Sequence, residues 1–235
     1  MDYGTAFTYP QQDSEWLKKW VILSLIGLIP IAGQILMLGY MLEIARRVIT
    51  NHPTPLPEWS DFGALAKQGV FGFVASLAYT LPIIVLFACA YAPLISAPLA
   101  AGDDPETLNT LMSAASLIAT CCFCVVFLLA VTVSIILPAA LGRLAVTGEI
   151  GSAFQFNEVI ALVRAQPATY LIVALLSGIA TSVLTSVGVI ACGIGAYFGA
   201  GYAILAQAHL YGQAYRVASG VSGSSATPSA GIAPA

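Results

Sequence analysis

Charged side chains are scarce in this chain. Only 8% of its 235 residues are Asp, Glu, Lys or Arg, whereas 59% are hydrophobic and the mean hydropathy is +0.90. Soluble domains carry about 25% charged residues, because a folded chain in water needs them on its surface. So little charge excludes an ordinary water-soluble domain and favours an integral membrane protein, whose apolar exterior is covered by lipid.

Basic clusters and catalytic motifs are also missing. The formal net charge is −3 and no run is rich in Lys or Arg, so we expect no nucleic-acid partner. The sequence has no Gly-x-Ser-x-Gly elbow, no His pair at zinc-binding spacing and no phosphate-binding Gly-x-x-x-x-Gly-Lys loop. We therefore expect a protein that is not an enzyme and that carries neither a metal nor a cofactor.

The five cysteines lie inside apolar stretches, which predicts free thiols. Three of them form the run Cys121-Cys122-Phe123-Cys124. Consecutive side chains on a helix point about 100° apart, and no His or acidic residue is close in sequence, so we interpret the run as packing residues rather than a metal cluster. Residues 1–15 form a polar segment without Lys or Arg, which argues against a cleaved signal peptide.

Four stretches contain no Asp, Glu, Lys, Arg or His, and they cover residues 20–42, 69–102, 107–142 and 165–208. A helix needs about 20 apolar residues to cross the hydrocarbon core, so the last stretch fits two spans, divided around residues 188–195. We predict an all-α, polytopic transmembrane helix bundle over residues 16–216 with about five spans. The spans are expected near residues 20–42, 70–100, 110–141, 168–187 and 193–213.

Basic residues indicate the orientation of these spans. Six of the eight Lys and Arg residues follow odd-numbered spans, whereas the acidic residues 103–106 follow the second span. The positive-inside rule then predicts a cytoplasmic C-terminus and, with five spans, an external N-terminus. Lys18 and Lys19 conflict with this arrangement. The alternative is that residues 20–42 enter the membrane and return, with a turn at Pro30–Gly33, which leaves every basic residue in the cytoplasm; we prefer the plain span.

Two connectors are expected to form amphipathic helices in the headgroup plane, near residues 57–68 and 152–165. Pro57 is expected at the start of the first of these helices. Glu43 and Arg47, just before that connector, are spaced for an i,i+4 ion pair. Residues 217–235 are rich in Ala, Ser, Gly and Pro and are expected to be a disordered tail.

An internal match supports the plain span. A shift of 97 positions pairs Arg46 with Arg143 and Thr50 with Thr147, and similar residues pair through the two connectors. The pattern suggests a degenerate parallel repeat, in which a span, a cytoplasmic connector and a second span recur. The first and third spans would then be equivalent.

Several motifs resemble a known family. They are PIAGQILMLGY from Pro30 to Tyr40, Arg46-Arg47, LPEWSD at residues 56–61, TGEIGSAF at residues 147–154 and HLYGQ at residues 209–213. In order and spacing the sequence is similar to the prokaryotic membrane family called domain of unknown function 4013. The resemblance implies a multi-pass membrane protein of bacteria or archaea, and it carries over no activity and no catalytic residue.

The motifs define a set of candidate functional or structural residues. They are Pro30, Gly33, Gly39, Tyr40, Arg46, Pro57, Glu58, Trp59, Asp61, His209, Gly212 and Gln213. Proline and glycine in the first stretch are typical of a broken helix around a binding site, although both are common in membrane helices. His209 has two interpretations, an interfacial side chain that fixes the helix or a proton-sensitive face.

The leading hypothesis for function is a non-enzymatic organising or interaction protein of the cell membrane, with membrane lipid, a second copy or another membrane protein as its partner. The alternative is a transporter or channel for a small neutral or lipid-like solute. A third hypothesis, an intramembrane enzyme acting on lipid, requires Glu58, Asp61 and His209 to converge around one cavity.

Overall fold

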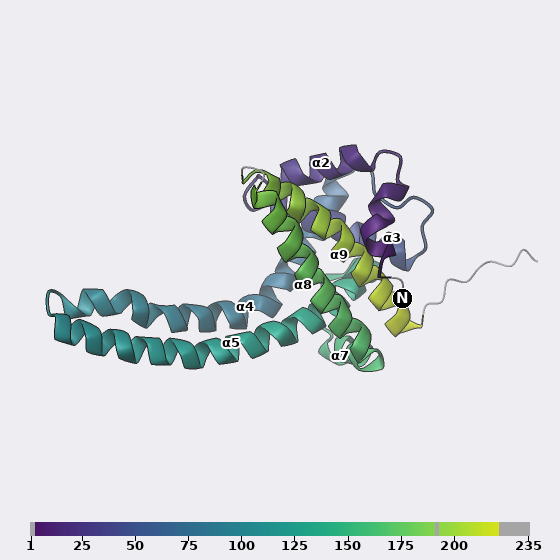
Figure 1. The fold of residues 1–235 in the computed structure, drawn as a ribbon. Coiled ribbons are helices and arrows are strands. Elements are labelled where there is room, and N and C mark those ends of the chain that lie inside the picture. The colour runs from purple at the N-terminus through teal and green to yellow at the C-terminus, as the bar shows by residue number, and fades with distance from the viewer. Residues whose placement is uncertain (1–2, 191–192, 221–235) are drawn as a thin grey trace, which may run out of the picture.

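The computed structural model describes residues 3–190 and 193–220, which contain helices and no strand (Figure 1). Two short N-terminal elements come first, α1 (Thr5–Thr8) and the 3-10 helix η1 (Tyr9–Gln12). The remaining helices are α2 (Trp16–Ile26), α3 (Ala32–Ile49), α4 (Phe62–Ala101), α5 (Pro105–Thr147), α6 (Ile150–Ala153), α7 (Phe156–Ala165), α8 (Pro167–Ile190) and α9 (Gly195–Ser219). The expected all-α fold is therefore confirmed.

Helices α4 and α5 form a long antiparallel hairpin that extends away from the other helices (Figure 1). Packing on the rest of the molecule ends near Tyr79 in α4 and Ile135 in α5. We call the hairpin beyond these residues, 80–134, the arm, and the other described residues the body. Asp104 caps α5, since its carboxylate accepts hydrogen bonds from the backbone N–H groups of Glu106 and Thr107. The arm is an apolar helix pair with an acidic turn at its tip.

Three helices in the described chain, α4, α5 and α8, are long and apolar enough to cross a membrane. They expose large apolar side chains along their length, such as Leu81, Leu99, Leu117, Phe127 and Leu175. An exterior of this kind is stable in lipid and unfavourable in water, which supports a membrane protein. The expected count of about five spans is not confirmed.

The expected span over residues 20–42 is not one helix. It is divided into α2 and α3 at residues 27–31, where Ile31 has φ of 64° and the N–H of Ala32 donates to the carbonyl of Pro30 at 2.7 Å. A Cβ at Gly33 would lie 2.0 Å from the carbonyl oxygen of Ile26, so only glycine fits this tight return. Moreover, Lys19 before the segment contacts Glu58 after it at 2.6 Å. The chain just before the segment and the connector that follows α3 therefore lie side by side.

The first connector also differs from expectation. Residues 57–61 are not helical, and α4 begins only at Phe62, where the carboxylate of Asp61 accepts a hydrogen bond from the N–H of Ala64 at 2.9 Å. Helix α4 then continues to Ala101, so no separate helix forms over residues 57–68. In the second connector α7 is a separate helix within the expected range 152–165. Of the expected disordered tail, residues 217–219 belong to α9, and residues 221–235 lie outside the described residues.

Glycine allows the body helices to approach closely. A Cβ at Gly39 of α3 would lie 1.9 Å from the carbonyl oxygen of Leu65, and one at Gly69 of α4 would lie 2.0 Å from that of Ile35. Because each glycine lacks a side chain, the backbone of the opposite helix contacts it directly. Gly199 of α9 does the same for Leu184 of α8, at 2.1 Å. The contacts between α3 and α4 fix the two helices that flank the first connector.

Candidate functional site

The connector between α3 and α4, residues 51–61, is held by hydrogen bonds to three successive backbone carbonyls. The phenol of Tyr9 donates to the carbonyl of Pro55 at 2.8 Å, and the phenol of Tyr40 donates to that of Pro57 at 3.1 Å. Lys19 and Arg47 both donate to the carbonyl between them, that of Leu56, at 3.4 and 3.1 Å. Donors from η1, α2 and α3 replace the ladder that a helix or strand would supply. We call this segment the clamped loop.

Lys19 is the most buried cation of the site. Its side chain is 4% exposed, and its ammonium lies 2.9 Å from a carboxylate oxygen of Asp13 and 2.6 Å from one of Glu58. Burial alone lowers the pKa of an amine, but the hydrogen bonds that Lys19 donates to Glu58 and Asp13 outweigh it and raise the pKa of Lys19. Burial likewise opposes ionisation of Asp13, yet the hydrogen bond from Lys19 keeps its pKa below the ordinary value. Both groups therefore stay charged, and they link the N-terminal segment to the loop.

A second ionic cluster lies on the last turns of α3. Arg46 makes a bidentate contact with Glu43, with both N–O distances at 2.8 Å, and Arg47 donates to the same carboxylate at 3.1 Å. Burial would raise the pKa of Glu43, but the two guanidinium groups lower it overall. The Glu43–Arg47 pair expected from i,i+4 spacing is confirmed. Arg46 remains 47% exposed, so part of its guanidinium faces solvent.

Stacking fixes the ring of Trp59. Its plane lies nearly parallel to that of Tyr40, at an angle of 7° and with ring centroids 4.4 Å apart. Tyr40 itself is fully buried, so it supplies both the stacking face and the hydrogen bond to Pro57. The loop therefore leaves α3 and enters α4 in one fixed conformation.

A polar groove of about 370 Å³ opens between the clamped loop and the facing turns of α3 and α4. Its charged lining comes from Glu43, Arg46, Arg47, Glu58 and Asp61. In the described part of the chain, two buried polar atoms at or beside the groove have no partner, Oε1 of Gln68 and Nε1 of Trp59. The groove thus combines both signs of charge, and the unpaired acceptor of Gln68 lies buried in its wall.

The structure brings together half of the candidate residues. Tyr40, Arg46, Pro57, Glu58, Trp59 and Asp61 all lie at the clamped loop or the groove. The other candidates have packing roles elsewhere. Pro30 and Gly33 form the α2–α3 turn, Gly39 lies at the α3–α4 crossing, and Gly212 receives Val48 of α3.

His209 does not join the groove. Its ring lies 4.2 Å from that of Tyr9, and Nδ1 lies 3.4 Å from Nε2 of Gln213 on the same helix. Its side chain is absent from the lining of the groove that carries Glu58 and Asp61. The convergence of these three residues around one cavity, which the lipid-enzyme hypothesis required, is not formed.

Sequence reasoning missed Tyr9, Asp13 and Lys19 as parts of the site. Lys19 bonds to Leu56, 37 positions away, and Tyr9 bonds to Pro55, 46 positions away. Contacts between such distant positions leave no local pattern in the sequence. One signal was present. Lys18 and Lys19 violated the positive-inside pattern of five spans, and that conflict disappears when Lys19 lies beside Glu58.

The second connector is held in a similar way. Arg143 of α5 donates to the carbonyl of Ser152 at 3.3 Å, nine residues further on, as Arg47 does to Leu56 at the same separation. Glu158 accepts a second bond from Arg143, and Tyr79 of α4 donates to the carbonyl of Ala153 at 2.7 Å. A basic residue at the end of a helix thus fixes each connector.

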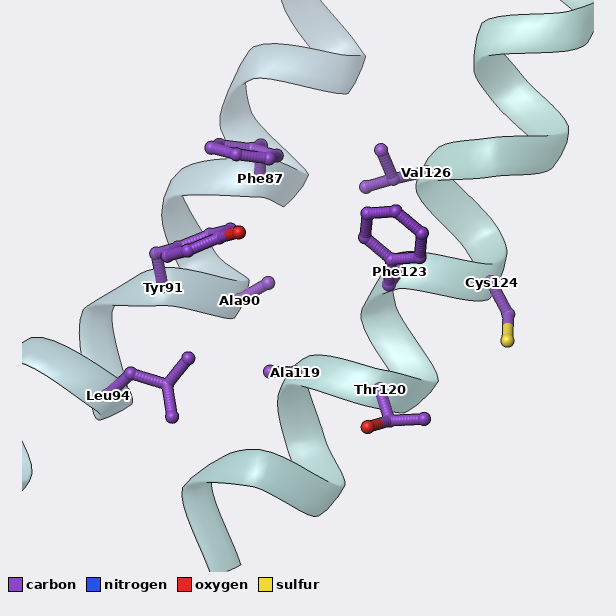
Figure 2. Close-up of a pocket in the computed structure, with 9 residues that line it drawn as sticks. All are labelled: Phe87, Ala90, Tyr91, Leu94, Ala119, Thr120, Phe123, Cys124 and Val126. Carbon is purple, nitrogen blue, oxygen red and sulfur yellow. The ribbon is translucent and has the colours of Figure 1, made fainter. Parts of the chain in front are cut away.

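The arm contains an apolar cavity of about 270 Å³ between α4 and α5. Figure 2 shows Phe87, Tyr91 and Leu94 of α4 on one side and Ala119 and Phe123 of α5 on the other. Its one hydroxyl from α5, that of Thr120, already donates to the carbonyl of Ser116 at 2.8 Å. The cavity therefore offers shape and apolar surface but no charged group.

Within residues 3–190 and 193–220, no group of three or more His, Cys, Asp or Glu side chains could hold a metal ion. Cys89, Cys121, Cys122 and Cys124 are free thiols on the arm, as expected, and the fifth cysteine, Cys192, lies outside the described residues.

Comparison with known proteins gives one match. No curated protein and no solved structure is significantly similar to the chain. One protein family, described as protein of unknown function (DUF4013), matches residues 22–194, which include α3, the clamped loop, the whole arm and α8. Because the match covers well over half of the chain, this protein belongs to the DUF4013 family.

Proposed function

We propose that this protein is a non-enzymatic organising protein of the cell membrane, which uses the polar groove to bind a lipid headgroup, a second copy or another membrane protein. The observation that carries the proposal is the clamped loop. Bonds to three successive carbonyls fix the backbone, so Glu58, Ser60 and Asp61 are presented in one arrangement. A preorganised surface binds at a lower entropic cost than a flexible one. The exposed part of the Arg46 guanidinium supplies a charged contact for a partner.

The proposed orientation has the arm across the bilayer and the polar end of the body in the cytoplasm. Residues 80–101 of α4 extend about 33 Å at about 1.5 Å per residue, which matches a hydrocarbon core of about 30 Å. The tip carries Asp103, Asp104 and Glu106, whereas all eight Lys and Arg residues belong to the body. The positive-inside rule then favours a cytoplasmic body and an external tip.

In this orientation the N-terminus and the C-terminus are both cytoplasmic, and the external N-terminus of the five-span arrangement is abandoned. The contact of Lys19 with Glu58 supports the change, because residues on opposite sides of a bilayer cannot lie 2.6 Å apart. A cysteine introduced at Thr5 in a cysteine-free variant should then be protected from an impermeant thiol reagent in intact cells. It should react once the cells are opened.

Site-specific photocrosslinking tests the organising role. A photoreactive residue at Ser60, in the groove, should give a defined adduct with lipid, a second copy or a neighbouring protein in native membranes. The matched control is Gly151, which is exposed on the second connector. Arg46→Ala should reduce the adduct at Ser60 because it removes the charged wall of the groove. Equal adducts at Ser60 and Gly151, unaffected by Arg46→Ala, would contradict the proposal.

A transporter or channel for a small neutral solute is the second candidate. It is supported by a cavity of about 350 Å³ between α3, α4 and α9, into which Gln34, Ser76 and Gln207 bring uncharged polar groups among apolar side chains. Purified protein in proteoliposomes would show saturable solute flux if this function is correct, and Gln207→Leu would reduce it. Such flux would refute the purely organising role.

A further inference from the structure

Three pairs of neighbouring helices form hairpins, α2–α3, α4–α5 and α8–α9. The end of α8 and the start of α9 lie on the side of the body from which the arm extends (Figure 1). The α2–α3 hairpin is bound to this end, because the indole of Trp20 donates to the carbonyl of Phe198 at 3.0 Å and Ser24 packs on Gly201. The turns of the two short hairpins therefore lie on the side of the body from which the arm extends, the side that the proposed crossing of the arm places toward the membrane.

The turns of these hairpins differ in charge. The turn of the arm contains Asp103, Asp104 and Glu106, as expected for a segment that emerges into water. The two short hairpins have no Asp, Glu, Lys or Arg near their turns, since residues 20–42 and 165–208 contain none. The arm therefore ends in charged residues, which favour water, whereas the other two turns have no charged residue that would favour water.

The short hairpins instead expose isoleucine. Ile29 and Ile31 at the α2–α3 turn are 50% and 70% exposed, and Ile190 and Ile194 at the α8–α9 turn are 86% and 62% exposed. Apolar surface of this extent is unfavourable in water and favourable among acyl chains. The exposed isoleucines of the α8–α9 turn continue the apolar exterior of α8, which indicates that the same solvent covers the turn and the helix.

Backbone hydrogen bonding at the α2–α3 turn also suits hydrocarbon. The N–H groups of residues 27–29 donate to carbonyls in α2, that of Ala32 donates to Pro30, and that of Gly33 donates to Ile29. Pro30 has no N–H to satisfy, so among residues 27–33 only the N–H of Ile31 makes no backbone hydrogen bond. In lipid each unpaired backbone group costs several kcal/mol, so irregular backbone persists there only when it is bonded internally. A turn that faces water has no such requirement.

We propose that the α2–α3 and α8–α9 hairpins are re-entrant: both enter the bilayer from the body side and end among the acyl chains, so only the arm crosses. The inference rests on the proposed crossing of the arm and adds a lipid-embedded surface to it. Helix α8 has the length of a span, but it runs obliquely to the arm in Figure 1, which reduces the depth that it reaches. The occupant of this surface is lipid acyl chain.

Nitroxide labels test the proposal. In a variant without native cysteines, labels at Ile31 and Ile194 should collide more often with oxygen, which concentrates in hydrocarbon, than with a water-soluble nickel complex. Labels at Asp103 and Ser60 should show the reverse. Both isoleucine positions are mostly exposed, so a label there displaces no core side chain. A nickel-dominated signal at Ile31 or Ile194 would overturn the inference.

Impermeant maleimide separates this inference from the crossing of the arm. In sealed vesicles of known orientation, cysteines at Asp103 and Ser60 should react from opposite sides, which tests the arm alone. Cysteines at Ile31 and Ile194 should react from neither side until detergent and denaturant are added, which also proves that the thiols are present. Reaction of Ile194→Cys from the Asp103 side would mean that α8–α9 crosses. In that case the re-entrant proposal fails while the crossing of the arm stands.

Discussion

Lys19 is the residue that joins most parts of the site. Its buried ammonium contacts Asp13, Glu58 and the carbonyl of Leu56, so one side chain connects the N-terminal segment, α2 and the clamped loop. A buried charge is tolerated only with partners of this kind. If it is removed, Asp13 remains buried with no counter-ion.

Lys19→Met should therefore destabilise the protein strongly. We expect a loss of about 3–5 kcal/mol in the free energy of unfolding, because one member of a buried ion pair is removed. Thermal or denaturant unfolding of the detergent-solubilised protein measures this loss. Lys18→Met is the matched control, since the Lys18–Glu15 pair is exposed and such pairs contribute about 0–1 kcal/mol. Equal effects of the two substitutions would contradict the structural role of Lys19.

The same ionic groups predict how stability depends on pH. The pKa values of Asp13 and Glu43 are lower in the folded protein than in the unfolded chain, so their stabilisation is complete above the unfolded values, about 4, and is lost as the pH falls. The melting temperature should fall below about pH 4. Asp13→Asn should show a shallower fall, because one of the two carboxylates no longer takes up a proton on unfolding. An unchanged slope would argue against the Asp13–Lys19 contact.

At the scale of elements, the crossing of α3 and α4 determines where the clamped loop begins and ends. Gly39 and Gly69 each lie against the backbone of the opposite helix. A methyl group at either position would meet a carbonyl oxygen, which cannot rotate away as a flexible side chain can. The two helices would have to separate, and with them the ends of residues 51–61.

Gly39→Ala should lower stability by about 1–3 kcal/mol or more, as overpacking of a tight contact does. It should also expose the ring of Trp59, which fluorescence quenching by acrylamide detects. Gly178→Ala is the control, because that helical glycine has nothing within 4 Å of an added Cβ. Alanine there should be neutral or stabilising by up to about 1 kcal/mol. If the two variants behaved alike, the close approach of α3 and α4 would be wrong.

The sequence indicates the long apolar helices well, because uninterrupted hydrophobic runs are a local property. It also identifies the PEW segment, residues 57–59, as important. It does not reveal that Pro57 precedes a non-helical stretch, since the bonds from Tyr40 and Lys19 that stabilise the loop come from distant positions. The break of α2 from α3 lies at the turn that the alternative to a plain span placed at Pro30–Gly33. Residues 20–42 have the length of a span, but the break at residues 27–31 and the contact of Lys19 with Glu58 argue against a single helix across the membrane.

The 97-residue repeat remains a hypothesis. The repeat pairs Arg46 with Arg143. In the structure, however, the counterpart of Arg143 is Arg47, one position later, because Arg47 and Arg143 each donate to a carbonyl nine residues ahead in their own connector. The similarity of the connectors is therefore chemical as well as sequential, although the register differs by one residue.

At the scale of the whole molecule, charge is segregated along the chain. Acidic residues alone occupy the tip of the arm, and every basic residue belongs to the body. Orientation in the membrane follows from the basic residues, since Asp and Glu contribute little to the positive-inside rule. The body should thus direct its own retention in the cytoplasm, and the tip should cross because it has no Lys or Arg to retain it.

Adding positive charge to the tip should disturb this orientation. We expect the triple variant Asp103→Lys, Asp104→Lys and Glu106→Lys to leave a large fraction of molecules with the tip on the cytoplasmic side, because short loops rich in Lys resist translocation. An impermeant thiol reagent directed at a cysteine in place of Asn109, an exposed position close to these residues, measures that fraction in intact cells. The control replaces the same three residues with Asn, Asn and Gln, which removes the charge without reversing it. Its tip should still be labelled from outside. If the lysine variant were labelled as fully as the control, the basic residues of the body would not determine the orientation, and the packing of the body itself would have to direct the arm across the bilayer.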